Sequence, residues 1–269
     1  LVNEFSSADV DGRLVRMEGA DVIALPGGSI FCRCLTTALM DSLARIARRT
    51  RERPVDGLVV EASGLADPRV ARDVLRELGL DQVFVLRSVV AVADARRVVR
   101  LARTLPVLRA QIEAADLVLL NKCDLATPAD IETAEAWIRS VRPDVDLRRC
   151  VRAETDADLF SLTAAPRSVH GEWAPARSPM FVTLELVPPR PTDLSALATA
   201  AREAGPDLLR MKGFVHAGDR TALIQWDGET FVVEPAPAGV PPLLVVVVRD
   251  GSVDAVRQRL ERALSSGTV

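Results

Sequence analysis

Lysine is nearly absent from this chain, because Lys122 and Lys212 are the only two among 269 residues. A phosphate-binding loop of the form Gly-x-x-x-x-Gly-Lys-[Ser/Thr] needs a lysine to reach the β- and γ-phosphate oxygens. Neither lysine has glycines in that spacing, so the 269 residues contain no such loop.

Long apolar runs and an excess of positive charge are missing as well. No stretch approaches the ~20 apolar residues that a membrane-spanning helix needs, and the first residues lack the layout of a signal peptide. The net charge of −3 argues against nucleic acid as the partner, because proteins usually bind it through a basic face. Four cysteines in a chain of this length do not form a disulfide framework. We therefore expect a cytoplasmic protein with no membrane or nucleic-acid partner; its oligomeric state is not predicted.

Short apolar runs alternate with helical patterns in the first half of the chain. That alternation predicts an α/β fold with a parallel sheet, which binds ligands at the carboxyl ends of its strands. The expected strands are 22–25, 57–60, 89–93, 117–120 and 146–151, and the expected helices are 36–49, 68–78, 107–114 and 129–141.

The apolar run at 117–120 ends in Asn121, Lys122, Cys123 and Asp124. A carboxylate at Asp124 can accept both the N1 hydrogen and the exocyclic amine of guanine, whereas adenine presents the opposite pattern of donors and acceptors. In this interpretation Asn121 braces the loop and touches the base, and the aliphatic part of Lys122 lies along the purine face. The alternative is an ordinary polar turn between a strand and a helix.

A second apolar run, at 57–60, ends in Glu61 and is followed three residues later by Gly64. This layout is typical of the segment that senses magnesium and the γ-phosphate in nucleotide hydrolases. Glu61 would hold a metal-bound water, and Gly64 would give its N–H to a phosphate oxygen, since no side chain blocks the approach. These two are the candidate catalytic residues. The alternative is a strand that simply ends at a glycine.

The composition changes between residues 164 and 179, which include three prolines and a glycine and predict a connector. The expected division is a nucleotide domain at 1–163, the linker at 164–179 and a small α+β domain at 180–269. Strands are expected at 181–186, 208–217, 222–226, 231–234 and 243–248, and helices at 192–204 and 253–264. Asp227 and Gly228 predict a hairpin between two of these strands.

Three segments of the nucleotide domain, 61–68, 89–95 and 111–124, resemble the CobW-like GTPases, the cobalamin synthesis protein CobW type of metallochaperone. Residues 209–214 resemble the C-terminal domain of that family. The resemblance implies a P-loop NTPase-type fold that binds GTP and Mg²⁺, hydrolyses GTP and delivers zinc or cobalt to a client metalloprotein. It also implies a client-facing or regulatory C-terminal domain, with Arg210, Lys212 and Trp226 as candidates for surface contacts, although Trp226 fits the core equally well.

Residues 2–5 resemble the part of the family that follows the phosphate-binding loop and its helix. We therefore expect the chain to lack about 35 residues of the family's nucleotide domain, one strand-loop-helix unit. Without the loop's lysine and hydroxyl, GTP hydrolysis should be impaired. Without the first strand, apolar surface on its neighbours should be uncovered.

Cys32 and Cys34 lie where the family usually has Gly-Cys-x-Cys-Cys, and the resemblance implies that they bind zinc or another divalent ion. On direct alignment Ser29 and Phe31 replace cysteines. Zinc takes three or four nitrogen or sulfur ligands in most sites, so two thiolates fall short, and Glu4 is the carboxylate expected to complete the site. The alternative is two small half-buried residues before a helix.

Two classes of function remain. The first is a GTP-hydrolysing metallochaperone that is catalytically complete only with the phosphate-binding loop. The second is a non-enzymatic guanine-nucleotide-binding or scaffold protein on the same fold. The coding sequence upstream of Leu1 would discriminate between them, because a loop ending in Gly-Lys-Thr favours the first and a stop codon favours the second.

Overall fold

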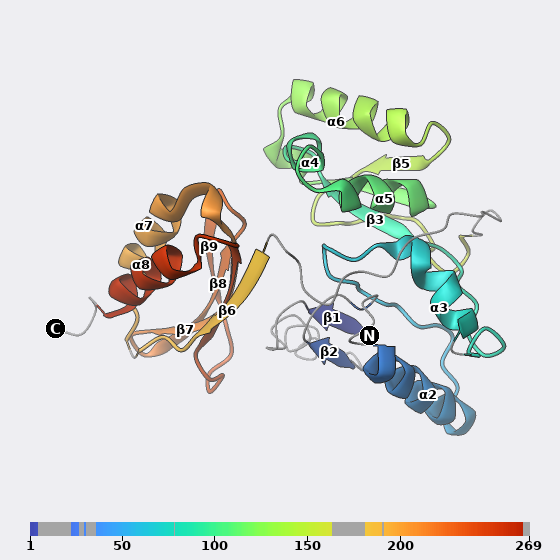
Figure 1. Ribbon diagram of the computed structural model, residues 1–269, viewed down its shortest axis with the longest axis horizontal. Helices are drawn as coiled ribbons and strands as arrows, with labels where there is room; N and C mark the ends of the chain where they lie inside the picture. Colours follow the sequence, from blue (N-terminus) through green and yellow to red (C-terminus); the bar gives the residue numbers. More distant parts are fainter. Residues whose placement is uncertain are drawn as a thin grey trace. The chain divides into compact units, whose positions relative to one another are not determined.

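The computed structural model describes residues 1–4, 23–26, 30, 36–77, 79–162, 181–189 and 191–265. The chain divides into two compact units (Figure 1). The first unit contains Leu1 and residues 29–176, and the second contains residues 2–28 and 177–269. In these described ranges no helix is both long enough and apolar enough to cross a membrane.

A parallel sheet of three strands forms the centre of the first unit. Its strands are β3 (Val90–Asp94), β4 (Leu117–Asn121) and β5 (Asp146–Arg149), in the order β3-β4-β5. The central strand β4 carries a continuous apolar run, and its first four residues are at most 4% exposed. A strand that is covered on both faces requires such a run, which confirms the predicted parallel α/β sheet.

Helices make the crossovers that parallel strands require. They are α2 (Thr36–Glu52), η1 (Pro68–Val70), α3 (Ala71–Glu77), α4 (Val98–Ala102), α5 (Pro106–Ala114), η2 (Cys123–Leu125) and α6 (Pro128–Val141). Of these, α4 and η2 were not predicted. The start of α6 is fixed by a capping box, in which Thr127 Oγ1 accepts the N–H of Asp130 and the Asp130 carboxylate accepts the N–H of Thr127.

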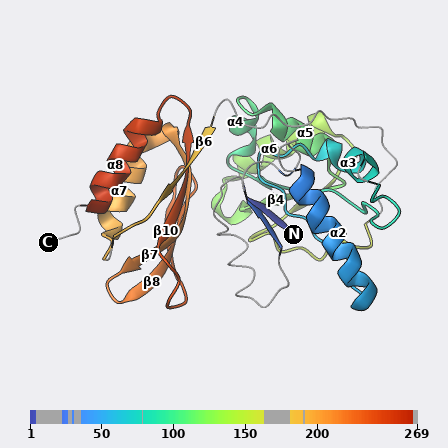
Figure 2. The same cartoon turned by 60° about the horizontal axis from the view of Figure 1, so that its bottom comes forward.

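Both faces of β4 are packed. On one face Val118 and Leu120 contact the cluster formed with α4, α5 and α6, three helices that lie next to one another (Figure 2). On the other face Leu117 and Leu119 contact Cys150 and apolar residues at 157–162. Strand β4 is therefore the buried support for the loop that follows Asn121.

The run at 57–60 was predicted to be a strand, and this prediction is wrong. Two backbone hydrogen bonds join this segment to Leu1, from Leu1 N to Val59 O at 2.7 Å and from Glu61 N to Leu1 O at 2.8 Å. They do not continue into a strand ladder. Val59 and Val60 are 60% and 42% exposed, and Val92 on β3 is 58% exposed. Apolar side chains are therefore exposed on this run and on β3.

The second unit contains a short parallel pair, β1 (Val2–Glu4) and β2 (Ala24–Pro26), and a five-stranded antiparallel sheet. The strands of the larger sheet are β6 (Phe181–Leu186), β7 (Leu208–Ala217), β8 (Arg220–Trp226), β9 (Phe231–Pro235) and β10 (Leu243–Arg249), in the order β6-β10-β7-β8-β9. The predicted hairpin joins β8 to β9, and Asp227 Oδ1 accepts the N–H groups of Glu229 and Thr230 in its turn. The predicted α+β domain is confirmed.

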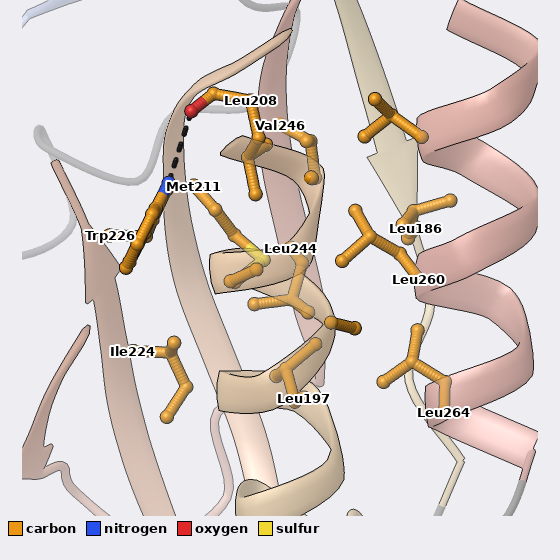
Figure 3. Packing of buried hydrophobic residues seen from close by; sticks show 14 of the residues in the cluster. Leu186, Leu197, Leu208, Met211, Ile224, Trp226, Leu244, Val246, Leu260 and Leu264 are labelled. Carbon is orange, nitrogen blue, oxygen red and sulfur yellow. Dashed lines mark hydrogen bonds between the residues drawn. The ribbon is translucent and has the colours of Figure 1, made fainter. Parts of the chain in front are cut away.

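Helices α7 (Leu194–Ala204) and α8 (Val253–Ser265) cover one face of this sheet, while η3 (Gly205–Asp207) joins α7 to β7. Figure 3 shows Leu197 of α7 and Leu260 of α8 pointing toward Met211 and Leu244 on the strands, and all four are fully buried. Trp226 belongs to the same core. It is 3% exposed and its Nε1 donates to the carbonyl of Leu208 at 3.0 Å, so the suggestion that it makes surface contacts is wrong.

Candidate functional site

The carboxyl ends of β3 and β4 meet at one edge of the parallel sheet, where Asp94 is the register partner of Asn121. Beyond this pair the chain turns into α4 on one side and into η2 on the other. The N–H of Ala95 donates to the carbonyl of Asn121 at 3.0 Å, which continues the pairing into the turn. The polar side chains on both turns are thus positioned by adjacent strands of the sheet.

Lys122 adopts a left-handed backbone conformation, with φ at 61°. A non-glycine residue in this region costs roughly 1–2 kcal/mol, so the surrounding contacts must hold it there. Its Nζ lies 3.0 Å from Oδ2 of Asp94, whose Oδ1 accepts the N–H of Arg96 at 3.0 Å. The ion pair therefore joins the loop after β4 to the turn after β3.

Asn121 links the loop after β4 to the loop after β5. Its Oδ1 accepts the N–H of Ala153 at 2.9 Å and lies 3.6 Å from the Cys150 thiol. Burial raises the pKa of the Cys150 thiol, which keeps it a protonated donor at neutral pH. Cys123, whose thiol donates to the carbonyl of Leu120 at 3.1 Å, packs at the edge of the core. Both cysteines therefore serve as small residues that line the core.

The loop at 151–153 was missed in the sequence, because the last strand of the sheet was extended through Val151. Strand β5 ends at Arg149, and Arg152 and Ala153 have φ of 53° and 57°. Left-handed residues are usually glycine or asparagine, so an Arg-Ala pair gives no turn signal. The strand order could have indicated this loop, because it follows β5, the parallel neighbour of β4, and so lies at the same carboxyl edge of the sheet as Asn121.

Asp124 lies in the first turn of η2, and its side chain is exposed. Within the part of the chain that the structure describes, its carboxylate has no hydrogen-bond or ion-pair partner. The nearby acids differ, because Asp94 binds Lys122 and Asp130 binds Thr127. Asp124 therefore retains both carboxylate oxygens for a ligand.

Glu61 and Gly64 lie on an exposed segment between the 57–60 run and η1. The N–H of Ala66 donates to the carbonyl of Ser63 at 2.8 Å, which closes a tight turn around Gly64. A Cβ built on Gly64 would meet no atom within 4 Å, so the fold itself does not require glycine there. A ligand that approaches the backbone closely does require it.

The same segment is fastened to α5. Gln111 Nε2 donates to the carbonyls of Gly64 and Ala66, both at 3.0 Å. In the sequence, Gln111 begins one of the segments that resemble the CobW-like GTPases, but no contact was predicted for it. The structure thus groups Asn121, Lys122 and Asp124 around one loop, and connects Gly64 and Ala66 to the helix that leads into β4.

The predicted metal ligands are not brought together by any described contact. Cys32 and Cys34 lie outside the described residues, and Glu4 is described only as the backbone end of β1. Among the residues that are described, no group of three or more histidine, cysteine, aspartate or glutamate side chains is arranged to hold a metal ion.

A parallel α/β sheet with polar loops at its carboxyl edge, followed by an antiparallel α+β domain, defines a nucleotide-binding protein with an appended domain. Residues 1–148 match the family described as CobW/HypB/UreG, nucleotide-binding domain. Residues 181–264 match the cobalamin synthesis protein cobW C-terminal domain. The chain belongs to the CobW/HypB/UreG family.

Several characterised relatives are zinc chaperones. The chain is 28% identical over 163 residues to zinc chaperone YeiR of Escherichia coli, covering 60% of this chain and 48% of YeiR. It is 30% identical over 170 residues to zinc chaperone CobW of Sinorhizobium sp, covering 52% of this chain and 47% of that protein. The chain thus spans about half the length of these relatives. The crystal structure of Zn(II)-bound YjiA GTPase from E. coli aligns with 84% of this chain and 77% of that chain, at a TM-score of 0.37 and 20% identity.

Proposed function

We propose that this chain is part of a GTP-binding, GTP-hydrolysing metallochaperone that delivers zinc or cobalt to a client metalloprotein. The observation that carries the proposal is the exposed Asp124 carboxylate, which follows a strand packed on both faces and has no described partner. Family membership over both domains and the zinc-chaperone relatives support it. The proposed division is a nucleotide domain at 1–163, a linker at 164–179 and a C-terminal domain at 180–269.

Guanine recognition is the first step. The two oxygens of Asp124 accept hydrogen bonds from N1 and the exocyclic amine of the base, a pattern that adenine cannot satisfy. Asn121 holds the loop through Ala153 while it touches the base, and the stem of Lys122 lies along the purine face with its ammonium on Asp94. These three residues bind and orient the nucleotide without taking part in bond cleavage.

Phosphate recognition falls to the segment at 61–64. The N–H of Gly64 would donate to a phosphate oxygen, and the Glu61 carboxylate would help to hold the hydrated cation. Magnesium, when bound with GTP, supplies neutralisation of phosphate charge. The open space around Gly64 and the exposure of Glu61 fit these roles.

Hydrolysis by this chain is expected to be slow. None of its residues forms a Gly-x-x-x-x-Gly-Lys-[Ser/Thr] loop, so no lysine in that setting can neutralise the β- and γ-phosphates. The same observation favours the second candidate, a non-enzymatic guanine-nucleotide-binding or scaffold protein that keeps base recognition and partner contacts.

Metal transfer would involve Cys32 and Cys34, with Glu4 closing the site. Zinc or cobalt is the cargo in this proposal, and a client metalloprotein receives it. A competition titration in which Cys32→Ser held as much zinc as the parent chain would remove this cysteine from the site.

The base-reading role is tested by Asp124→Asn, which replaces one acceptor oxygen with a donor amide. We expect the variant to lose affinity for GDP and to gain affinity for the xanthine nucleotide, whose C2 carbonyl accepts from that amide. Glu154→Gln, a comparable change in the neighbouring loop, serves as the matched control. An unchanged preference for guanine in a binding titration would refute the role.

A further inference from the structure

The side chain of Gln111 uses both of its amide hydrogens on one short segment. Nε2 donates to the carbonyls of Gly64 and Ala66 at 3.0 Å each, two residues apart on either side of Leu65. An amide nitrogen has two hydrogens to donate, so this fork uses its full capacity. The residue lies near the end of α5, which stops at Ala114 shortly before β4 begins.

A second attachment lies on the same helix. Arg69 donates to Asp67 at 2.7 Å and to Glu113 of α5 at 3.2 Å, and Glu113 also accepts from Arg109 at 2.9 Å. The hydrogen bonds to Asp67 are the largest cause of a raised pKa for Arg69, which stays charged. The turn is therefore fastened to α5 at its centre by Gln111 and at its end by this ion-pair network.

The hydrogen bond between Ala66 and Ser63 sets which way the Gly64 amide faces, and Gln111 holds the turn that contains it. The Ser63 carbonyl points into the turn, where it accepts the N–H of Ala66 at 2.8 Å. In a trans peptide the N–H points opposite to the carbonyl, so the Gly64 N–H faces out of the turn. Gln111 holds the two following carbonyls, at Gly64 and Ala66, and thereby keeps the turn from rotating.

We propose that Gln111 is a positioning residue that presents the outward N–H of Gly64 to the terminal phosphate of a nucleoside triphosphate. This inference rests on the proposed nucleotide function. Only a triphosphate benefits from the presented N–H, so Gln111 sets the preference for triphosphate over diphosphate. Because Gln111 lies on the helix that leads into β4, the same residue links the phosphate segment to the loop that carries Asp124.

The test uses Gln111→Glu in the full 269-residue chain. Glutamate has nearly the same shape but presents acceptors to two carbonyls, so the fork opens. Gln111→Met, which cannot donate, is a second variant in case the charge disturbs folding. Gln258→Glu makes the same chemical change on an exposed position of α8 and is the matched control. Circular dichroism verifies that each variant folds.

Two measurements decide the proposal. Hydrogen exchange of the Ala66 amide, which donates to the Ser63 carbonyl, should be roughly tenfold faster in both Gln111 variants and unchanged in Gln258→Glu. The second measurement is a titration with GDP and with a non-hydrolysable imido analogue of GTP, both with Mg²⁺. Both Gln111 variants should bind the analogue with roughly tenfold lower affinity than the parent chain and bind GDP with unchanged affinity.

Equal exchange in all variants would overturn the fastening role of Gln111. Faster exchange with an unchanged ratio of triphosphate to diphosphate affinity would overturn the positioning role and leave a structural one. If the parent chain binds no guanine nucleotide while exchange still rises selectively, the proposed nucleotide function fails, and Gln111 positions the turn for another purpose than phosphate recognition.

Discussion

The ammonium of Lys122 lies 3.0 Å from the carboxylate of Asp94, so the loops after two adjacent strands are joined by charge as well as by backbone pairing. Lys122 holds a left-handed conformation that most residues avoid. The ion pair is one of the contacts that keeps it there. The geometry of the loop that carries Asp124 therefore depends partly on a residue of the preceding strand.

We expect Asp94→Asn to lower the free energy of unfolding by about 0.2–1 kcal/mol, because Lys122 is more than a third exposed and solvent screens the pair. The asparagine oxygen can still accept the N–H of Arg96, so the turn itself is retained. Affinity for GDP should fall as the loop loosens. Urea denaturation and a GDP titration measure the two effects.

The control for that variant is Glu203→Gln, which breaks a more exposed ion pair with Arg259 in the second unit. It should affect stability to a comparable extent and leave GDP binding unchanged. If Asp94→Asn and Glu203→Gln bind GDP equally well, the Lys122–Asp94 pair has no part in shaping the site.

Arg142 is buried, with 7% of its side chain exposed, and its guanidinium donates to the carbonyls of Glu113 and Ala115 at the end of α5. We expect Arg142→Met to cost about 2 kcal/mol, because the substitution leaves buried carbonyls without a donor. Arg148→Met is the control, since that residue is 36% exposed and binds exposed carboxylates. Equal midpoints in urea for both variants would contradict the expectation.

Glu135 of α6 accepts hydrogen bonds from Arg149 of β5 at 2.6 and 3.0 Å, and these bonds lower the pKa of Glu135. A carboxyl group whose pKa is lower in the folded state contributes stability fully above its ordinary pKa and loses it as pH falls through the folded value. Arg149→Leu should therefore reduce stability at neutral pH and have no effect below the folded pKa. Urea denaturation across this range measures the difference, and a difference that persists in acid would mean that Arg149 acts through packing.

The sequence predicted the sheet well where burial alone decides the structure. The apolar run before Asn121 became the central strand β4, and the Asp-Gly pair before Glu229 became a hairpin turn. The prediction failed at 57–60, where an equally apolar run forms no strand. Local sequence shows that a segment can form a strand, but it does not show whether a neighbour is present along its length.

The candidate site could be predicted only in part from the sequence, for a related reason. Asn121, Lys122 and Asp124 stand together in the sequence and remain together in the structure. The contact of Asn121 with Ala153 and those of Gln111 with Gly64 and Ala66 join residues that are far apart in the chain. Neither contact uses a residue type that marks a turn or a ligand, so only the three-dimensional arrangement exposes them.

The packing on both faces of β4 has a final consequence. A loop that begins from a rigid strand has little freedom to lose when a base arrives. Discrimination between purines would then depend on a surface that is already formed before the nucleotide binds. The entropy lost on binding would come mainly from ordering the segment that contacts the phosphates.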